Sequence, residues 1–146
     1  RAFYLPEEAD SFFEAHYDYA VDAVDTVTAK VDLAVQCQVR NIPLIASMGA
    51  ANKLDPTLFE VMDIYRTKGD PLARILRKKL KDRGVQRLTV VCSRERPKRP
   101  AAGICAPAPG RHLAPGSVSF VPPVAGMIMA GVVVRALTGA AAEVSS

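Results

Sequence analysis

The sequence contains few cysteines, the residues that cross-link small folds or bind metals. Its three cysteines, Cys37, Cys92 and Cys105, are odd in number and widely spaced, and no Cys-x-x-Cys pair occurs among the 146 residues. This pattern argues against a disulfide framework and against a four-cysteine zinc site. Free cysteines are typical of the reducing cytoplasm, where we expect this protein to be. We expect Cys92, which follows an apolar run, to be buried.

Two catalytic signatures are missing as well. Gly126 and Gly131 have the spacing of a Walker A phosphate loop, but two valines follow where lysine and serine or threonine are required. No other segment is a glycine-rich phosphate loop. The two histidines, His16 and His112, do not form part of a Ser/His/Asp set, and we expect both at the surface.

The long uncharged segment near the end of the sequence is interrupted by prolines. Residues 118–134 carry no charge, but Pro122 and Pro123 interrupt them and leave eleven uncharged residues before Arg135. A span needs about 20 residues. The run therefore predicts a buried core helix that starts near Pro123, in which Gly126 and Gly131 allow close approach of another backbone.

What is present is an ordinary globular composition with a strongly uneven charge. Hydrophobic residues make up 49% and charged residues 23%, which predicts one folded domain with a core. Residues 1–65 hold eleven acidic and four basic side chains, whereas residues 66–99 hold thirteen basic and three acidic ones. Such a basic block indicates a polyanion partner, phosphate or RNA. The alternative interpretation is a solvated helix face followed by a loose loop.

The apolar periodicity predicts alternating strands and helices. We expect strands at residues 2–6, 19–25, 43–47, 57–65 and 87–93, and a short helical turn at 11–16. Helices are predicted at 26–40, capped by Asp25 or Thr26, and from Asp70-Pro71 to Gly84. The second helix has the apolar stripe Leu72, Ile75, Leu76 and Leu80, with cations on its remaining surface. Residues 94–115 are predicted to be a flexible loop and 140–146 a frayed tail. A strand, helix and strand in succession form a parallel crossover.

Two carboxylates fall where the first long strand ends, Asp22 and Asp25. In an open parallel sheet, ligands bind beyond the carboxyl ends of the strands. A carboxylate there can hold a Mg²⁺ ion that bridges phosphates. The alternative is that Asp25 only caps the following helix, and from spacing alone this alternative is favoured.

Several motifs resemble one family. Residues 22–25, Asp-Ala-Val-Asp, followed by Lys30, resemble the second nucleotide motif of the ubiquitin-activating-like (ThiF/MoeB-type) superfamily, and residues 41–45 resemble its next strand. Residues 49–57, 63–73 and 116–123 resemble the tRNA threonylcarbamoyladenosine dehydratase branch. The resemblance covers roughly residues 2–138.

This resemblance implies an α/β fold, the C-terminal half of a Rossmann-like ThiF/MoeB-type domain, with a mixed parallel and antiparallel sheet flanked by helices. It also implies ATP with Mg²⁺ as cofactors, tRNA as partner, a homodimer and no membrane partner. The site residues would be Asp25 for metal and cofactor, Thr26 and Lys30 for cofactor, and for nucleic acid the cations of the basic helix: Arg74, Arg77, Lys78, Lys79 and Lys81. Asp22 would be structural.

The sequence departs from the family in two places. The Gly-x-Gly-Gly-x-Gly loop and the Arg and Lys that bind ATP phosphates precede this region in the family and are absent from these 146 residues. Ala51-Asn52 also stands where the family often has a glycine pair. Two alternatives stay open: a sulfur-carrier-protein adenylyltransferase, whose two Cys-x-x-Cys pairs are absent here, and a non-catalytic binding or dimerisation module.

The missing phosphate loop generates a prediction for the 146-residue chain on its own. It should show no ATP-dependent dehydratase activity and should bind Mg-ATP with a Kd weaker than about 10 μM, or about −6.8 kcal/mol. Isothermal titration calorimetry measures this directly. A tighter Kd would mean that these residues contain a complete nucleotide site.

Overall fold

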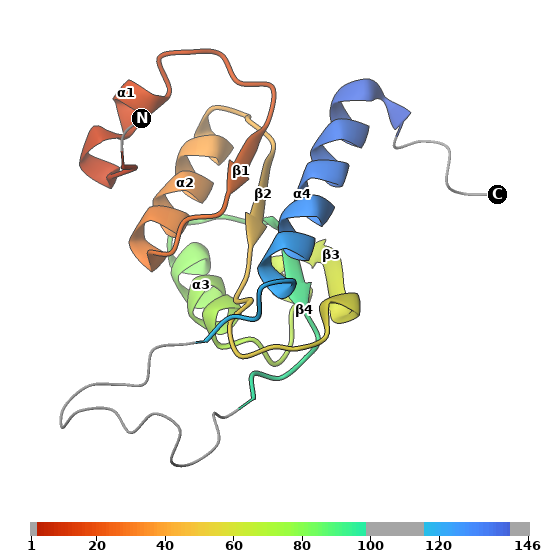
Figure 1. Ribbon diagram of the computed structural model, residues 1–146. Coiled ribbons are helices and arrows are strands. Elements are labelled where there is room, and N and C mark those ends of the chain that lie inside the picture. Colours follow the sequence, from red (N-terminus) through yellow and green to blue (C-terminus); the bar gives the residue numbers. More distant parts are fainter. Residues whose placement is uncertain (1–2, 99–115, 141–146) are drawn as a thin grey trace.

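The structure, a computed structural model, describes residues 3–98 and 116–140 (Figure 1). Its helices are α1 (Ala9–Phe12), α2 (Val27–Val39), α3 (Pro71–Asp82) and α4 (Val121–Thr138). Its strands are β1 (Ala20–Asp22), β2 (Leu44–Ser47), β3 (Phe59–Asp63) and β4 (Thr89–Ser93), and 3-10 turns cover Pro6–Glu8, Pro56–Leu58 and Ile64–Arg66. Four predicted strands and two predicted helices are confirmed with narrower bounds. Of the predicted loop at 94–115, residues 94–98 are described and contain no helix or strand, whereas 99–115, with Cys105 and His112, lie outside the described residues, as does the predicted tail at 140–146 from residue 141 on.

The four strands form one open mixed sheet in the order β1-β2-β4-β3. β1, β2 and β4 are parallel, with Val21 opposite Ile45 and Ala46 opposite Val90. β3 runs antiparallel to β4 at the other edge, with Val61 opposite Val91. The expected mixed sheet is therefore confirmed, and the parallel strands direct their carboxyl ends to one edge.

The two central strands are apolar on both faces because helices cover both sides (Figure 1). Ala46 and Val90 lie in the core beneath α2 and α3, and Ile45 and Val91 lie in the core beneath α4. All four side chains are fully buried. β-Branched residues with little alternation are typical of parallel strands that are buried on both faces.

The N-terminal strand prediction is wrong for the residues that the structure describes. Residues 3–5 are extended without strand pairing, and a 3-10 turn and α1 follow. The Tyr4 hydroxyl donates to Asp32 of α2 at 2.6 Å, and the Tyr4 ring packs against Phe12 with centroids 5.1 Å apart. Burial of these rings against α2 therefore holds the segment beside the helix rather than at a sheet edge.

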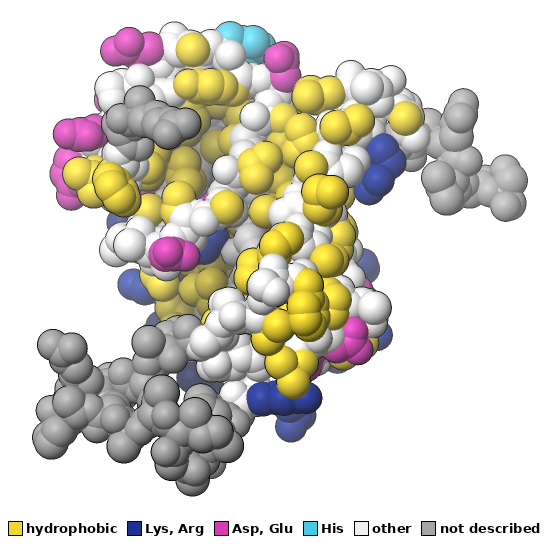
Figure 2. Space-filling model, in the orientation of Figure 1, with side chains coloured by type: hydrophobic (Ala, Val, Ile, Leu, Met, Phe, Trp, Pro, Cys, Tyr) yellow, Lys and Arg dark blue, Asp and Glu magenta, His cyan; other side chains and the backbone are white. Residues whose placement is uncertain are grey.

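The prediction of a buried core helix near Pro123 is also wrong in its burial. α4 begins at Val121, with prolines in its first turn, and buries only Val121, Ala125 and Met129. These residues repeat every four positions and form one narrow stripe on the sheet. Figure 2 shows apolar side chains exposed along the rest of the helix, and the most exposed large ones nearby are Phe120, Met127, Val134 and Leu137.

The predicted close approach of another backbone at the glycines of α4 does not occur among the described residues. A Cβ atom at Gly126 would meet nothing within 4 Å, and one at Gly131 would meet only the side chain of Arg135. By length and composition alone, α4 is apolar enough to cross a membrane, with 17% of it buried in the fold. The absence of a membrane partner stays a prediction.

A buried ion pair joins the loop after β2 to the start of α3. Lys53 Nζ lies 3.0 Å from Asp70 Oδ2 and donates to the carbonyl oxygen of Gly49 at 2.5 Å. The two side chains are 0% and 1% exposed. Asp70 Oδ1 accepts from the backbone N–H of Ala73 at 2.8 Å and so caps α3. One carboxylate therefore fixes both the loop and the helix.

Removing the buried cation should destabilise the fold strongly. Lys53→Met leaves the Asp70 carboxylate buried without its partner, and we expect a loss of about 3–5 kcal/mol in the free energy of unfolding. Lys98→Met is the matched control, because Lys98 is exposed and 3.9 Å from Glu95, and it should cost less than about 1 kcal/mol. Urea denaturation measures both changes.

A second variant tests the cause of that loss. Lys53→Met with Asp70→Asn removes both charges and keeps a side chain that caps helices well. It should be more stable than Lys53→Met alone. If the double variant is the less stable of the two, the uncompensated charge is not the source of the loss.

Candidate functional site

A pocket of about 670 Å³ lies beyond the carboxyl ends of β1 and β2. We call it the aspartate pocket. Its lining comes from the segment after β1, the loop after β2, and the start of α4: Ala23, Val24, Asp25, Lys30, Ser47, Met48, Gly49, Ala50, Ala51, Leu72, Ser117, Pro122, Gly126 and Met129. This is the edge of a parallel sheet at which ligands bind.

Asp25 is exposed in this pocket and does not cap α2. The N-cap position belongs to Thr26, and no side chain makes a cap hydrogen bond there. Within residues 3–98 and 116–140, the Asp25 carboxylate has no hydrogen-bond or ion-pair partner of its own. The capping interpretation that spacing favoured is therefore wrong. The first N–H groups of α2 remain available to an anion, which a helix N-terminus attracts.

Asp22 and Lys30 form a buried pair behind Asp25. Lys30 Nζ lies 3.1 Å from Asp22 Oδ1 and donates to the carbonyl oxygen of Ser47 at 2.9 Å. This contact ties the end of β1 to the end of β2. Asp22 Oδ1 also accepts from the N–H of Val24, whereas Oδ2 has no partner among the described residues. Burial raises the pKa of Asp22, and the Lys30 charge opposes that rise.

Asn52 holds the chain that closes the pocket on the α4 side. It has a φ of 58°, a left-handed conformation that asparagine tolerates better than most residues. Its N–H donates to the Gly116 carbonyl oxygen at 2.7 Å, and its side-chain oxygen accepts from the Gly116 N–H at 3.1 Å. Asn52 therefore forms the turn itself and holds Gly116, the neighbour of the pocket-lining Ser117.

Among the residues of the basic helix α3, only Leu72 lines the aspartate pocket. Four of its predicted RNA-binding cations are exposed: Arg74, Lys78, Lys79 and Lys81. Arg77 is half-buried and donates to the Thr67 carbonyl oxygen at 3.0 Å and to the Thr67 hydroxyl. The predicted stripe needs one correction, because Ile75 is exposed and Ala73 takes a buried position instead.

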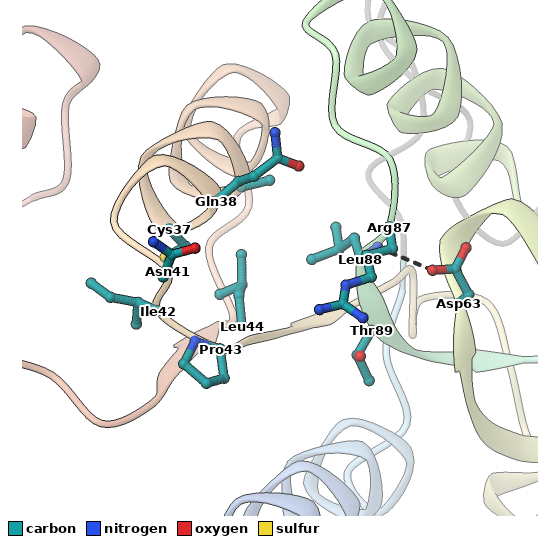
Figure 3. Close-up of a pocket in the computed structure, with 11 residues that line it drawn as sticks. Cys37, Gln38, Asn41, Ile42, Pro43, Leu44, Asp63, Arg87, Leu88 and Thr89 are labelled. Atoms are coloured by element: carbon teal, nitrogen blue, oxygen red, sulfur yellow. Dashed lines mark hydrogen bonds between the residues drawn. The ribbon is translucent and has the colours of Figure 1, made fainter.

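A further pocket, of about 590 Å³, opens at the opposite end of the sheet, where the parallel strands β2 and β4 begin (Figure 3). Its acidic group is already engaged, because the Asp63 carboxylate accepts from the N–H groups of Tyr65 at 2.8 Å and Leu88 at 3.2 Å. Its cysteine, Cys37, is buried, and burial raises the pKa of that thiol to about 11. These groups support the fold, so this pocket is the weaker candidate.

Sequence reasoning missed the residues that shape the aspartate pocket from a distance. Lys53 lies inside the motif at residues 49–57, but nothing in the sequence of that motif predicts a fully buried cation. Lysine is almost never fully buried. Gly126 and Met129 come from a helix far along the chain. The only signal for them was the resemblance of residues 116–123 to the family's C-terminal region.

Comparison with known proteins gives a consistent picture. The model of the ThiF family matches residues 2–146. The chain is 41% identical over 145 residues to the tRNA threonylcarbamoyladenosine dehydratase of Bacillus subtilis, covering 94% of this chain and 57% of that protein. It is 46% identical over 81 residues to dehydratase 2 of Saccharomyces cerevisiae, covering 55% of this chain and 18% of that protein. The chain thus spans little more than half of the Bacillus protein.

Solved structures match the fold over nearly the whole chain. The Escherichia coli tRNA N6-threonylcarbamoyladenosine dehydratase in complex with AMP superposes with a TM-score of 0.80 at 27% identity, covering 97% of this chain and 56% of that one. The same enzyme in complex with ATP gives a TM-score of 0.78 at 27% identity, covering 99% and 57%. The α/β fold is therefore shown independently of the motifs.

The buried cysteines generate a prediction about reactivity. Cys92 is 2% exposed, which confirms its expected burial, and burial raises the pKa of its thiol to about 11, as for Cys37. Because the thiolate is the reactive form, the two-unit rise from an ordinary thiol lowers the thiolate fraction by about 100-fold at pH 8. Iodoacetamide should modify both at least about 100-fold more slowly in the native chain than in urea, as measured by peptide mass spectrometry. Equal rates would contradict their burial.

Proposed function

Since this chain belongs to the ThiF family, we propose that it is part of an ATP-dependent tRNA-modifying dehydratase that cyclises threonylcarbamoyladenosine. The observation that carries the proposal is Asp25, an exposed carboxylate in the aspartate pocket at the carboxyl edge of the parallel strands. The relatives of that name, and the solved relative in complex with ATP, support it. On this proposal, the chain is the C-terminal portion of the catalytic domain.

The proposed reaction joins activation to ring closure. A carboxylate oxygen of threonylcarbamoyladenosine would attack a phosphorus atom of ATP and displace the remainder of the ATP molecule, and that oxygen would then belong to a leaving group. A nitrogen of the same modification then attacks the activated carbon. The oxygen departs with the phosphate and the nitrogen loses its proton, so the base has lost one water in total. The part of the chain described here contributes binding and charge to these steps.

The residues around Asp25 fit a nucleotide with Mg²⁺. Within the described ranges, no group of three potential metal ligands occurs, so a protein-only metal cage is not what this pocket provides. Mg²⁺ usually binds one or two carboxylates together with substrate phosphates, and Asp25 supplies such a carboxylate. When bound, Mg²⁺ would offset negative charge on the phosphates.

Thr26 and Lys30 complete the proposed nucleotide contacts. Thr26 is the N-cap of α2, whose N-terminus favours anions, and its hydroxyl makes no cap hydrogen bond. Lys30 uses two of its three N–H donors on Asp22 and Ser47, so it holds the ends of two strands at the wall of the pocket where the phosphates would bind. Asp22 is the structural partner in this arrangement.

The remaining assignments concern partners and location. The exposed cations of α3, with Arg77 beside them, are the proposed contact with tRNA. A homodimer is the proposed assembly, and the exposed apolar side chains of α4 support it. The two free, buried cysteines among the described residues support a cytoplasmic location.

Asp25→Asn in the natural full-length protein tests the proposal. The change removes a formal charge with little change of shape, and Asp25 has no structural contact to lose among the described residues. Dehydration of threonylcarbamoyladenosine in tRNA should fall by more than about tenfold, which corresponds to about 1.4 kcal/mol, while the Tm stays the same. Nucleoside mass spectrometry with and without ATP measures the product.

Asp18→Asn is the matched control, because it removes the same charge at a position away from the pocket. The Asp18 side chain is 76% exposed. This variant should leave the activity as in the parent. Unchanged activity in Asp25→Asn would remove Asp25 from the site. If the parent transfers AMP to a protein carboxylate instead, the adenylyltransferase interpretation replaces this one.

A further inference from the structure

A second pocket, beside the outer strand β3, carries an excess of positive charge. It measures about 710 Å³, and we call it the cationic pocket. It is lined by the outer part of β3, the segment after it, and the end of β4 with the following loop: Glu60, Val61, Met62, Arg66, Lys68, Gly69, Cys92, Ser93, Arg94 and Arg96. Four cations and one carboxylate leave it a formal charge of +3.

Most of this charge is not neutralised within the described part of the chain. Arg94 Nε lies 2.8 Å from Glu60 Oε1, and Glu60 is the one carboxylate among the described lining residues. Arg66, Lys68 and Arg96 have no carboxylate within 4.0 Å among residues 3–98 and 116–140, and all three are exposed. A cleft lined by one sign of charge concentrates ions of the opposite sign.

The other nearby carboxylate is held by a neighbouring loop. Glu95 Oε2 accepts from the N–H groups of Leu54 and Asp55, each at 2.9 Å. These hydrogen bonds lower the pKa of Glu95, and the bond from the Asp55 N–H contributes most. The ionised Glu95 carboxylate is thus already bound to backbone N–H groups. Arg94 and Arg96, on either side of it in the chain, remain exposed.

Buried contacts beneath the pocket set the positions of its cations. The hydroxyl of Thr67, which is buried, donates to the Ile64 carbonyl oxygen at 2.6 Å, and Arg77 donates to the Thr67 carbonyl oxygen. This arrangement leaves the neighbours of Thr67, Arg66 and Lys68, exposed on either side. Gly69 has a φ of 78°, and a Cβ atom there would lie 3.9 Å from Arg96 Cγ.

The two pockets share a structural wall. Lys53 donates to Gly49, which lines the aspartate pocket, and pairs with Asp70, which directly follows Gly69 of the cationic pocket. The cationic pocket extends from the carboxyl end of β4 along the outer strand β3. One buried ion pair therefore holds residues that border both pockets.

We infer that the cationic pocket binds backbone phosphates of the RNA substrate. Arginine suits this role because its planar guanidinium binds phosphate oxygens through two parallel hydrogen bonds. The inference rests on the proposed function for the identity of the RNA. It adds a contact that is distinct from the exposed cations of α3, and Arg77 links the two surfaces through Thr67.

The test is the double variant Arg66→Gln with Arg96→Gln in the natural full-length protein. Filter binding of a tRNA transcript and of poly(U) is measured at several salt concentrations. Affinity for both RNAs should fall by about tenfold, and the salt slope should decrease by about 1.4–1.8, because two phosphate contacts are lost. The Tm and the affinity for Mg-ATP should not change.

Two further variants separate position from total charge. Arg87→Gln with Arg135→Gln removes two exposed cations from other surfaces and should change RNA affinity by less than about twofold. Arg66→Lys with Arg96→Lys keeps the charge and should retain most of the salt slope. RNA affinity and slope equal to the parent in the Gln variant, or an equal loss in the Arg87/Arg135 control, would overturn the inference.

Inorganic phosphate separates the two sources of this anion. If phosphate binding detected by calorimetry is lost in the Gln variant but RNA binding is not, the pocket serves a free anion and the RNA assignment is wrong. A parent protein that lacks dehydratase activity yet loses RNA affinity in the Gln variant refutes the proposed function and leaves this inference standing. A parent that binds neither RNA overturns the inference.

Discussion

The burial of one ammonium group organises the carboxyl edge of this sheet. Lys53 is fully enclosed, and an ion in that position is tolerated only if it is paired and hydrogen-bonded. Asp70 supplies the charge and the Gly49 carbonyl oxygen supplies the second bond. The loop after β2 must therefore pass close to the start of α3. Gly49 lines the aspartate pocket, and Gly69, which precedes Asp70, lines the cationic pocket.

A second buried pair, Asp22 with Lys30, works in parallel with the first. It ties β1 to β2 at the point where both strands end, so the chain that leaves β1 has a fixed direction. Asp25 follows three residues later and is exposed. These two aspartates have the same side chain and differ in their surroundings. Asp22 is buried and paired with a cation, whereas Asp25 is exposed and available for a ligand.

Much of the fold follows from local patterns, whereas the site depends on contacts between distant segments. Short apolar runs located β2 and β4, and a proline after an aspartate cap located the start of α3. Hydrophobicity alone overestimated the burial of α4, because an uncharged helix lies on the sheet with only one of its faces. Spacing alone favoured a cap at Asp25, because capping and ligand binding use the same residue type at the same position. The Lys53–Asp70 pair and the cationic pocket join residues 17 or more positions apart, and no local periodicity encodes such contacts.

The strand order β1-β2-β4-β3 has a consequence for how the chain reaches this structure. Among the strands of the described residues, β4 comes last in sequence but lies inside the sheet, where it pairs with β3 on one side and with β2 on the other. β1 and β2 can pair as soon as their crossover helix forms, yet the sheet remains in two separate parts until residue 93 has been synthesised. Non-local pairing of this kind slows folding, and an unpaired strand edge is exposed to other chains in the meantime. During synthesis, the interval before β4 enters the sheet is the period in which this chain is most open to misassociation.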